Sequence, residues 1–386
     1  MATKGWASPE AEKSSARTTE LRQRLTIDFE QTWYALRGDY LVHLTRLDLR
    51  KAVETAAQMI ARAEERGSAR HVAQAETWLA MARMFSGDLD LAAQCFERAW
   101  ALLESIAKPA TGLTEQHAGL MPQAETFERI FTQATTRGYS ALNLWLLGHP
   151  DRALERLIVA TAIVRESGQR DVLAEVHILA ATVHNLRGEL EHVRLRAEAA
   201  FELATEGNPY FRAQGGILLG WADAMAGDLD GGIARMRCHL LEFRATGAEL
   251  ATDSYLALIA TALGQKGECD EGLRTIDESL AIIERTGARA SDAEVHRLKG
   301  ELLMAQEASN AAQAEQSFRT ALEISRKQNA KSLELRATTS LARLLGQQGR
   351  RDEARAMLTE IYGWFSEGFD TADLKDAKAL LKQLDA

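Results

Sequence analysis

Proline and cysteine are both scarce in this sequence. Only five of its 386 residues are proline, which leaves room for long uninterrupted helices. The three cysteines, Cys95, Cys238 and Cys269, are odd in number and far apart, so they spell out neither a disulfide framework nor a zinc site. No run of about eighteen apolar residues is present to span a bilayer, and the first residues contain no signal-peptide core. We therefore expect a reducing, cytoplasmic location.

The sequence also has no excess of positively charged residues. The chain has 46 lysines and arginines against 55 aspartates and glutamates, so its net charge is −9. Nucleic-acid phosphates require a basic face on the protein that binds them. Nucleic acid is therefore not an expected partner, and neither is a membrane.

Motifs that carry catalysis are absent from the sequence. It has no Gly-x4-Gly-Lys-Ser/Thr loop, no Gly-x-Ser-x-Gly elbow and no His-Glu-x2-His pair. His177 and His184 would lie two helical turns apart, about 10 Å, which is too far to share one metal ion. Asp228 and Asp230 resemble the start of a calcium loop, but His239 stands where the loop needs glutamate, so they are better interpreted as acids at a helix N-terminus. We predict no enzyme activity, no cofactor and no metal site.

What the sequence has instead is a repeated spacing of small residues around turn glycines. The intervals from Gly148 onwards are 40, 39, 40 and then 82, which is twice 41. The turn glycines are Gly87, Gly148, Gly188, Gly227, Gly267 and Gly349. Seven residues before them stand Ala80, Ala141, Ala181, Gly220, Ala260 and Ala342, and five residues after them stand Ala92, Ala153, Val193, Gly232, Gly272 and Ala354. Small residues at these positions let two antiparallel helices touch beside a tight turn.

This spacing resembles the tetratricopeptide repeat, although the period is near 40 where that family has about 34. The turn-to-small distances keep their usual values, so the extra residues must lengthen the helices. A seventh turn falls at Glu307–Ala311, where Gly300 holds the small position and Phe318 the large one. We predict an all-α fold of about eight helical hairpins, wound into a right-handed superhelix.

The domain prediction is a single repeat array over residues 1–386. Residues 1–66 are expected to form a degenerate capping repeat, because Tyr40 occupies its first small position. Residues 105–125 contain two prolines and two glycines and are expected to form an insert loop. Residues 367–386 are expected to supply a C-terminal capping helix.

The chain resembles a known bacterial group over nearly all of its length, most weakly over residues 105–140. The stretches that carry the resemblance are Gly363–Lys375, Leu144–Asp151, Arg244–Leu250, Arg297–Leu303, Ser332–Ala337 and Gly5–Glu10. They are similar to the C-terminal tetratricopeptide-like tail of signalling proteins that carry a nucleotide-cyclase or other output domain and a P-loop ATPase. The resemblance implies a regulatory tail, and the cyclase and ATPase modules would lie ahead of residue 1.

Six residues form the predicted partner- or ligand-binding groove. Positions one and four after each small residue face the concave side in tetratricopeptide arrays, and here they give an apolar and aromatic first half of the groove. The residues are Met81, Met84, Leu142, Trp145, Asn185 and Trp221. The alternative is that the longer helices shift the register and that both tryptophans belong to the core.

Two functions are compatible with these features. The first is a non-catalytic scaffold of a bacterial signalling system, with a protein or peptide partner in its groove. The second is an effector-sensing tail of an adenylate-cyclase-like or ATPase-type regulator, acting in cis in relatives or in trans here, with a small-molecule effector as its ligand. The identity of the partner or effector, the oligomeric state and whether Met1 is a natural start are left open by the sequence.

Overall fold

The computed structural model describes residues 28–107, 123–204 and 208–385, together with Ser8, Lys13, Ser14 and Arg17. Within these residues there are seventeen α-helices, one short 3-10 helix and no strand. No helix in the described ranges is both long and apolar enough to cross a membrane. Most of the predicted insert at 105–125 lies outside the described residues, and so does most of the segment before residue 28.

The helices follow one another as eight antiparallel hairpins and a last single helix. The hairpins are α2 (Phe29–Thr45) with α3 (Leu49–Glu65), α4 (Ala69–Phe85) with α5 (Leu89–Ala107), α6 (Gln123–Leu146) with α7 (Pro150–Ser167), α8 (Arg170–Arg187) with α9 (Leu190–Leu203), α10 (Pro209–Met225) with α11 (Leu229–Ala245), α12 (Thr252–Lys266) with α13 (Cys269–Thr286), α14 (Asp292–Gln306) with α15 (Ala311–Lys327), and α16 (Lys331–Gln347) with α17 (Arg351–Trp364). The single helix is α18 (Ala372–Asp385), and the 3-10 helix η2 (Ala308–Asn310) joins α14 to α15. From α10 onwards the first helices of successive units begin 39 to 43 residues apart. The predicted all-α, tetratricopeptide-like fold class is confirmed.

Glycine turns end the first helix of most hairpins. Each of the six predicted turn glycines has a positive φ, between 78° and 111°, which residues with a Cβ adopt only at a cost. Some helices then begin with a side-chain cap or with proline. The carboxylate of Asp228, for example, accepts the Gly231 N–H at 3.0 Å. Pro150 and Pro209 occupy first helical positions, where a missing N–H is no loss.

The small residues mark the places where the helices of a hairpin touch. A Cβ atom added to Gly220 would lie 2.8 Å from the Gly232 carbonyl oxygen, and one added to Gly232 would lie 2.4 Å from the Gly220 oxygen. Ala80, Ala141 and Ala181 are fully buried at the equivalent position. The predicted register of the hairpins is therefore correct.

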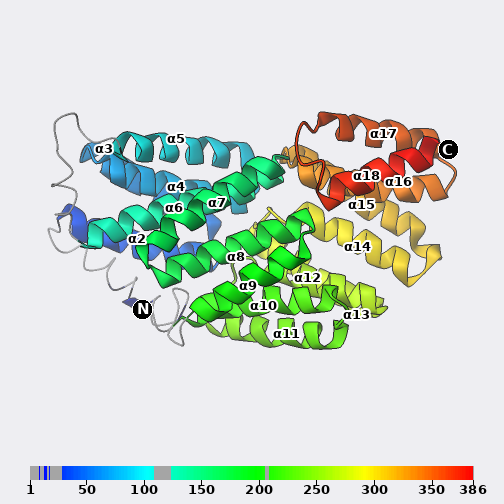
Figure 1. Cartoon of the computed structure of the whole chain (residues 1–386), viewed down its shortest axis with the longest axis horizontal. Helices are drawn as coiled ribbons and strands as arrows, with labels where there is room; N and C mark the ends of the chain where they lie inside the picture. Colours follow the sequence, from blue (N-terminus) through cyan, green and yellow to red (C-terminus); the bar gives the residue numbers. More distant parts are fainter. Residues whose placement is uncertain are drawn as a thin grey trace.

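The array curves back on itself. In Figure 1, α2 to α7 occupy the upper left, α8 to α13 the lower part and α14 to α18 the upper right of the molecule. As a result, each of the first four hairpins contacts the unit five positions later along the chain. Five hairpins therefore complete one turn of the superhelix.

Hydrogen bonds join the superhelical turns at the C-terminal ends of α2, α4, α6 and α8. The Thr45 carbonyl accepts the N–H of Glu249 at 2.8 Å, and the Phe85 carbonyl accepts that of Arg289 at 2.8 Å. The Trp145 carbonyl accepts the hydroxyl of Ser332 at 2.5 Å. The last carbonyls of a helix have no partner within that helix, so later repeats satisfy them here.

The fourth contact between superhelical turns is ionic. Arg187, at the end of α8, is buried and lies 3.0 Å from the carboxylate of Asp151 and 3.3 Å from that of Asp370. Next to it, a Cβ atom on Gly188 would lie 2.6 Å from the Cβ of Ala372. Helix α18 thus packs on the α8–α9 turn as the other later units pack on theirs.

Candidate functional site

A cavity of about 440 Å³ runs through the centre of the superhelix. Its wall is built from the first helices of seven consecutive hairpins, α4 to α16, together with α18 and the connections before α12 and α14. The second helices of the hairpins lie outside. This division follows from the small residues, which hold the two helices of each hairpin in contact and leave the first helices to face the superhelix axis.

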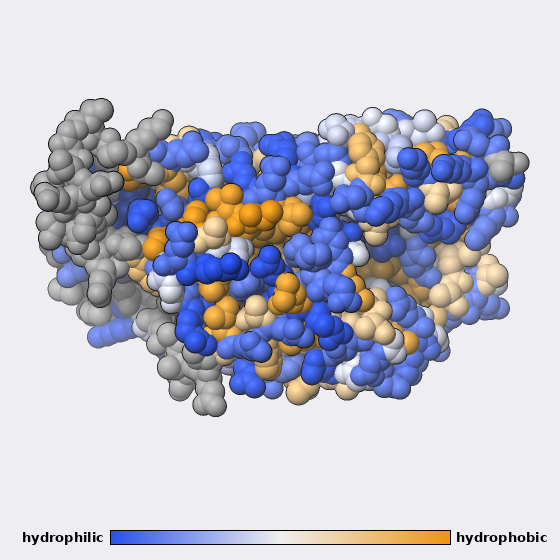
Figure 2. Space-filling model, in the orientation of Figure 1, coloured by the Kyte–Doolittle hydropathy of each residue, from blue (hydrophilic) through white to orange (hydrophobic). Residues whose placement is uncertain are grey.

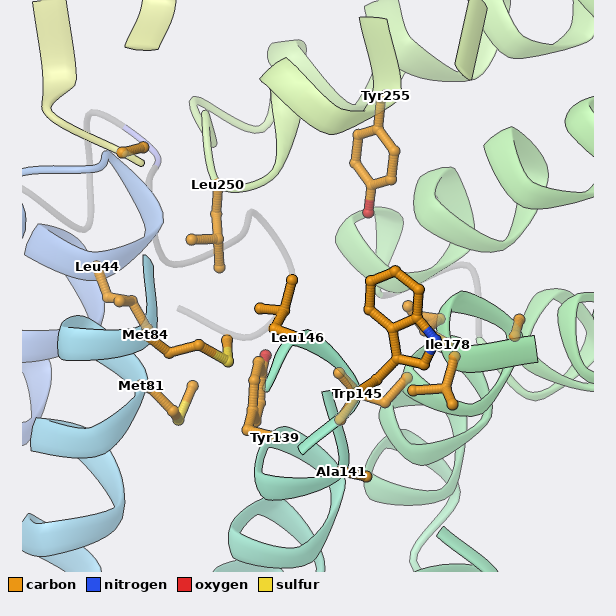
Figure 3. Close-up of a cluster of buried hydrophobic side chains, with 14 of the residues drawn as sticks. Leu44, Met81, Met84, Tyr139, Ala141, Trp145, Leu146, Ile178, Leu250 and Tyr255 are labelled. Carbon is orange, nitrogen blue, oxygen red and sulfur yellow. The ribbon is translucent and has the colours of Figure 1, made fainter. Parts of the chain in front are cut away.

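One side of the cavity is apolar and aromatic. Figure 3 shows Met84, Tyr139, Leu146 and Leu250 pointing toward one another from α4, α6 and the connection before α12. The Trp145 ring lies between this group and Tyr255. These side chains exclude water while leaving a volume that a ligand of the size of a small molecule can fill.

Two of the three tyrosines on this side, Tyr139 and Tyr210, lie near the partly buried carboxyl group of Glu175. The Tyr139 hydroxyl donates to Glu175 at 3.4 Å, a long hydrogen bond. The Tyr255 hydroxyl donates to the side-chain oxygen of Gln214 at 2.8 Å, and Tyr210 lies close by. Burial raises the pKa of Glu175 to about 7, against which the hydrogen bond from Tyr139 acts only weakly.

The opposite side of the cavity carries an ion-pair network from α14, α16 and α18. Arg297 donates to both carboxylate oxygens of Glu294, at 2.8 and 2.9 Å, and Arg336 bridges Glu294 at 3.2 Å and Asp373 at 2.8 Å. The Arg336 guanidinium also lies 4.8 Å from the centre of the Trp145 ring. Burial acts to raise the pKa of Glu294, but the two guanidinium groups outweigh burial and hold its pKa at about 2. This carboxylate is therefore a permanent anion.

Five of the six sequence-predicted groove residues line this cavity: Met84, Leu142, Trp145, Asn185 and Trp221. Met81 is buried one turn earlier on α4 and is not part of the lining. Trp145 is 1% exposed and Trp221 is 9% exposed. Both tryptophans are thus packed into the wall and also border the cavity. Their role in binding stays a prediction.

The ion-pair network and the tyrosines are residues that the sequence analysis did not select. A signal for part of them exists in the sequence. Glu301 and Arg343 directly follow the small residues Gly300 and Ala342, and the inward face of a helix continues four and seven residues before such a position. Counting back from Glu301 gives Arg297 and Glu294, and counting back from Arg343 gives Thr339 and Arg336; all of them line the cavity. The connections that supply Leu250 and Ser291 follow no such period.

One group of metal-type ligands occurs among the described residues. The ligand atoms of His184, Glu189 and His192 lie within 4.8 Å of one another at the α8–α9 turn. Glu189 is already held by His184 at 2.5 Å and by the Arg187 guanidinium at 2.7 Å. The positive charge of Arg187 opposes a cation at this position. The group is accounted for as part of the contact between superhelical turns.

The outer surface carries both hydrophilic and apolar residues. Most of the face in Figure 2 is hydrophilic, and apolar residues gather near its centre. Exposed large apolar side chains on the outer helices include Ile158 and Leu195, which are 58% and 59% exposed. Scattered exposed apolar residues are normal on a protein surface, so the cavity is the stronger candidate site.

Comparison with known proteins identifies the fold and leaves the family open. No family model matches the chain. A curated protein of Rhizobium meliloti strain 1021, described as uncharacterized protein R02095, is 29% identical over 222 residues. That match covers 54% of this chain but 20% of the relative, so the chain matches about a fifth of that protein's length.

Solved structures share the architecture. A Rap protein in complex with competence and sporulation factor superposes with a TM-score of 0.60 over 97% of this chain and 94% of its own, at 11% identity. A signal-transduction ATPase with a tetratricopeptide repeat sensor from Pyrococcus horikoshii gives a TM-score of 0.45 at 14% identity, over 98% of this chain and 55% of its own. At 11% identity, the likeness to the Rap protein shows the helical-repeat fold.

Proposed function

We propose that this chain is a non-catalytic binding module of a bacterial signalling system, and that its central cavity binds a short peptide or an exposed segment of a partner protein. The observation that carries the proposal is the cavity itself, which the first helices of seven hairpins enclose. Such a volume is typical of a specific ligand site. The protein is expected to act in the cytoplasm.

The size of the cavity favours a short segment over a folded partner. One turn of an α-helix with its side chains occupies a cylinder of about 10 Å diameter and 5.4 Å length, or roughly 420 Å³. The cavity of about 440 Å³ is thus large enough for a short segment and far too small for a folded domain. The contacts between superhelical turns at Thr45, Phe85 and Trp145 keep it from widening into an open groove.

A second candidate function is an effector-sensing tail of an adenylate-cyclase-like or ATPase-type regulator. The Rhizobium meliloti relative supports it, because the matched segment is a fifth of a much longer protein. The same cavity would then bind a small-molecule effector, and occupancy would be transmitted to an output domain in cis or in trans.

The test identifies the ligand and then locates its site. The purified chain is incubated with a low-molecular-mass extract of its host, and retained compounds are identified by mass spectrometry covering peptides and metabolites. The affinity of the identified compound is then measured calorimetrically for the wild type, for Asn185→Ala in the cavity wall and for Leu195→Ala on the outer surface. We expect Asn185→Ala to weaken binding and Leu195→Ala to leave it unchanged. Equal affinities for all three proteins would contradict the proposed site.

A further inference from the structure

The cavity is lined by more acidic than basic side chains. Five carboxyl groups and three guanidinium groups line it: Asp253, Glu294, Glu301, Asp373 and Asp376 against Arg297, Arg336 and Arg343. All three arginines are already engaged. Arg297 pairs with Glu294 and Glu301, Arg336 with Asp373 and Glu294, and Arg343 with Asp376. An anionic ligand would have to displace one of these pairs, whereas a cationic ligand would not.

Two carboxyl groups near the aromatic side have no cationic partner among the described residues. Asp253, at the start of α12, is 4% exposed and accepts a hydrogen bond from the Ser291 hydroxyl. Glu175 has the Tyr139 hydroxyl as its hydrogen-bond donor, but it is only partly buried and is not part of the cavity lining. Buried carboxylates are normally paired with a cation or strongly hydrogen-bonded. Asp253 is therefore suited to receive positive charge from a ligand.

The aromatic rings of the cavity lining also favour a cationic ligand. Tyr139, Tyr210, Tyr255, Trp145 and Trp221 all line the cavity. The faces of such rings attract ammonium and guanidinium groups, and the attraction is stronger where water is excluded. Aromatic rings with unpaired carboxyl groups beside them are typical of a cation-binding pocket.

Polar groups of the cavity wall that have no protein partner indicate which hydrogen-bonding groups the ligand carries. Within the described ranges, the indole N–H groups of Trp145 and Trp221 form no hydrogen bond with the protein, and neither nitrogen is among the fully buried unpaired atoms. The side-chain amide of Asn185 has no protein partner in the same ranges. All three residues line the cavity, so a ligand there can supply their partners. Two N–H donors and a free amide match the carbonyl and N–H groups of a peptide backbone.

From these observations we infer that the cavity binds a short peptide segment that carries a basic side chain among apolar residues, with the basic group held by Asp253 and the tyrosines of the lining. The inference rests on the proposed function and specifies its ligand. The apolar residues of the peptide pack against Met84, Leu146 and Leu250.

The experiment uses the full chain and two pools of N-acetylated, C-amidated tetrapeptides. One position is arginine in the first pool and glutamate in the second, and the other positions vary among Ala, Val, Leu and Phe. Tryptamine serves as a free aromatic amine. Thermal shift and calorimetry are expected to show that the arginine pool raises Tm and binds, and that the glutamate pool and tryptamine bind at least about tenfold more weakly.

One variant locates the basic group. Asp253→Asn is expected to weaken binding of the arginine pool by about tenfold. It removes a buried carboxyl group without a cationic partner, so it is not expected to lower the Tm of the free protein. Glu360→Gln, on an exposed position of α17, is the control and is expected to bind as the wild type does.

Each other outcome overturns the inference in a distinct way. Preference for the glutamate pool would contradict the basic group, and tryptamine binding as tightly as the arginine pool would contradict the peptide. In the first case the proposed function stands if Asn185→Ala weakens binding of the glutamate pool. In the second case the same effect of Asn185→Ala on tryptamine would favour the small-molecule effector of the second candidate function. If neither pool binds, the inference is wrong, and the extract experiment decides the proposed function separately.

Discussion

At Gly220 the absence of a side chain lets helices α10 and α11 touch at backbone distance. A Cβ atom there would lie 2.8 Å from both the Gly232 oxygen and the Met236 nitrogen. Real Cβ atoms are not found so close to backbone atoms, and the backbone of a neighbouring helix cannot rotate away as a side chain can. The small residues of the repeat are therefore a steric requirement of the hairpin.

Gly220→Ala tests this requirement. In an open helix the change from glycine to alanine stabilises by about 1 kcal/mol. Here overpacking is expected to outweigh that gain and to lower the free energy of unfolding by about 1–3 kcal/mol, as measured by urea denaturation. Ala234→Leu, which adds a larger side chain at an exposed position of α11, should stay within about 0.5 kcal/mol of the wild type. A stabilised Gly220→Ala variant would contradict the steric argument.

Glu175 predicts a pH dependence at the residue scale. Because its folded pKa is raised to about 7, the folded state holds a proton that the unfolded state has lost above its ordinary value of 4.5. The stability contributed by this group is thus present at low pH and is lost as pH rises through 7.

The variant that checks this is Glu175→Gln, which cannot lose the proton. We expect it to be more stable than the wild type at pH 8, by on the order of 1–2 kcal/mol, and to differ little at pH 5. Thermal unfolding of both proteins at the two pH values provides the comparison. A wild type that gains stability relative to the variant between pH 5 and pH 8 would refute the raised pKa.

At the scale of elements, some turns do more than reverse the chain. The turn glycines Gly87, Gly148 and Gly188 each lie against a later repeat, whereas Gly227, Gly267 and Gly349 have open space around the position of a Cβ. The first group belongs to the hairpins that a later superhelical turn covers. In the first half of the chain a turn glycine therefore both reverses the chain and packs against a later repeat. In the second half it only reverses the chain.

Gly188→Ala and Gly267→Ala separate these two purposes. Both glycines have a similar positive φ, 78° and 84°, so both substitutions carry the same backbone cost of about 1 kcal/mol. At Gly188 the new methyl group also meets Ala372 of α18 at 2.6 Å. We expect Gly188→Ala to be the more destabilised variant by about 1–3 kcal/mol in chemical denaturation. Equal losses would mean that α18 does not pack on this turn in solution.

At the scale of the whole molecule, the contacts between superhelical turns change how the array unfolds. An open repeat array contacts only its neighbours and can lose its end repeats separately. Here the first hairpin is bonded to the sixth, the second to the seventh and the third to the eighth. Losing one end therefore removes contacts from the middle of the chain as well.

We expect unfolding to be a single cooperative transition. Tryptophan fluorescence reports mainly on the first five hairpins, which contain Trp33, Trp78, Trp100, Trp145 and Trp221, whereas far-ultraviolet circular dichroism reports on all helices. The two signals should give the same urea midpoint. A fluorescence midpoint clearly separated from the circular dichroism midpoint would contradict coupling between the two halves.

The sequence by itself determined the local structure of this protein. Glycine turns and small contact positions are steric demands between neighbours in the chain, so their spacing alone predicts the hairpins from residue 28 onwards, including the longer turn at η2. The inward face of each first helix follows from the helical period, which is why five of six predicted groove residues lie on the cavity wall. The expected caps and the insert at 105–125 stay predictions.

Only the tertiary structure decided how tightly the array winds and what closes its centre. The pairing of Arg187 with Asp370, and of the Trp145 carbonyl with Ser332, joins residues 183 and 187 positions apart, and no local spacing encodes such a distance. The same winding brings the charged residues of α14 to α18 opposite the aromatic residues of α6 to α10. The rotations between successive hairpins add up along the whole array to set this geometry, so no single hairpin determines it.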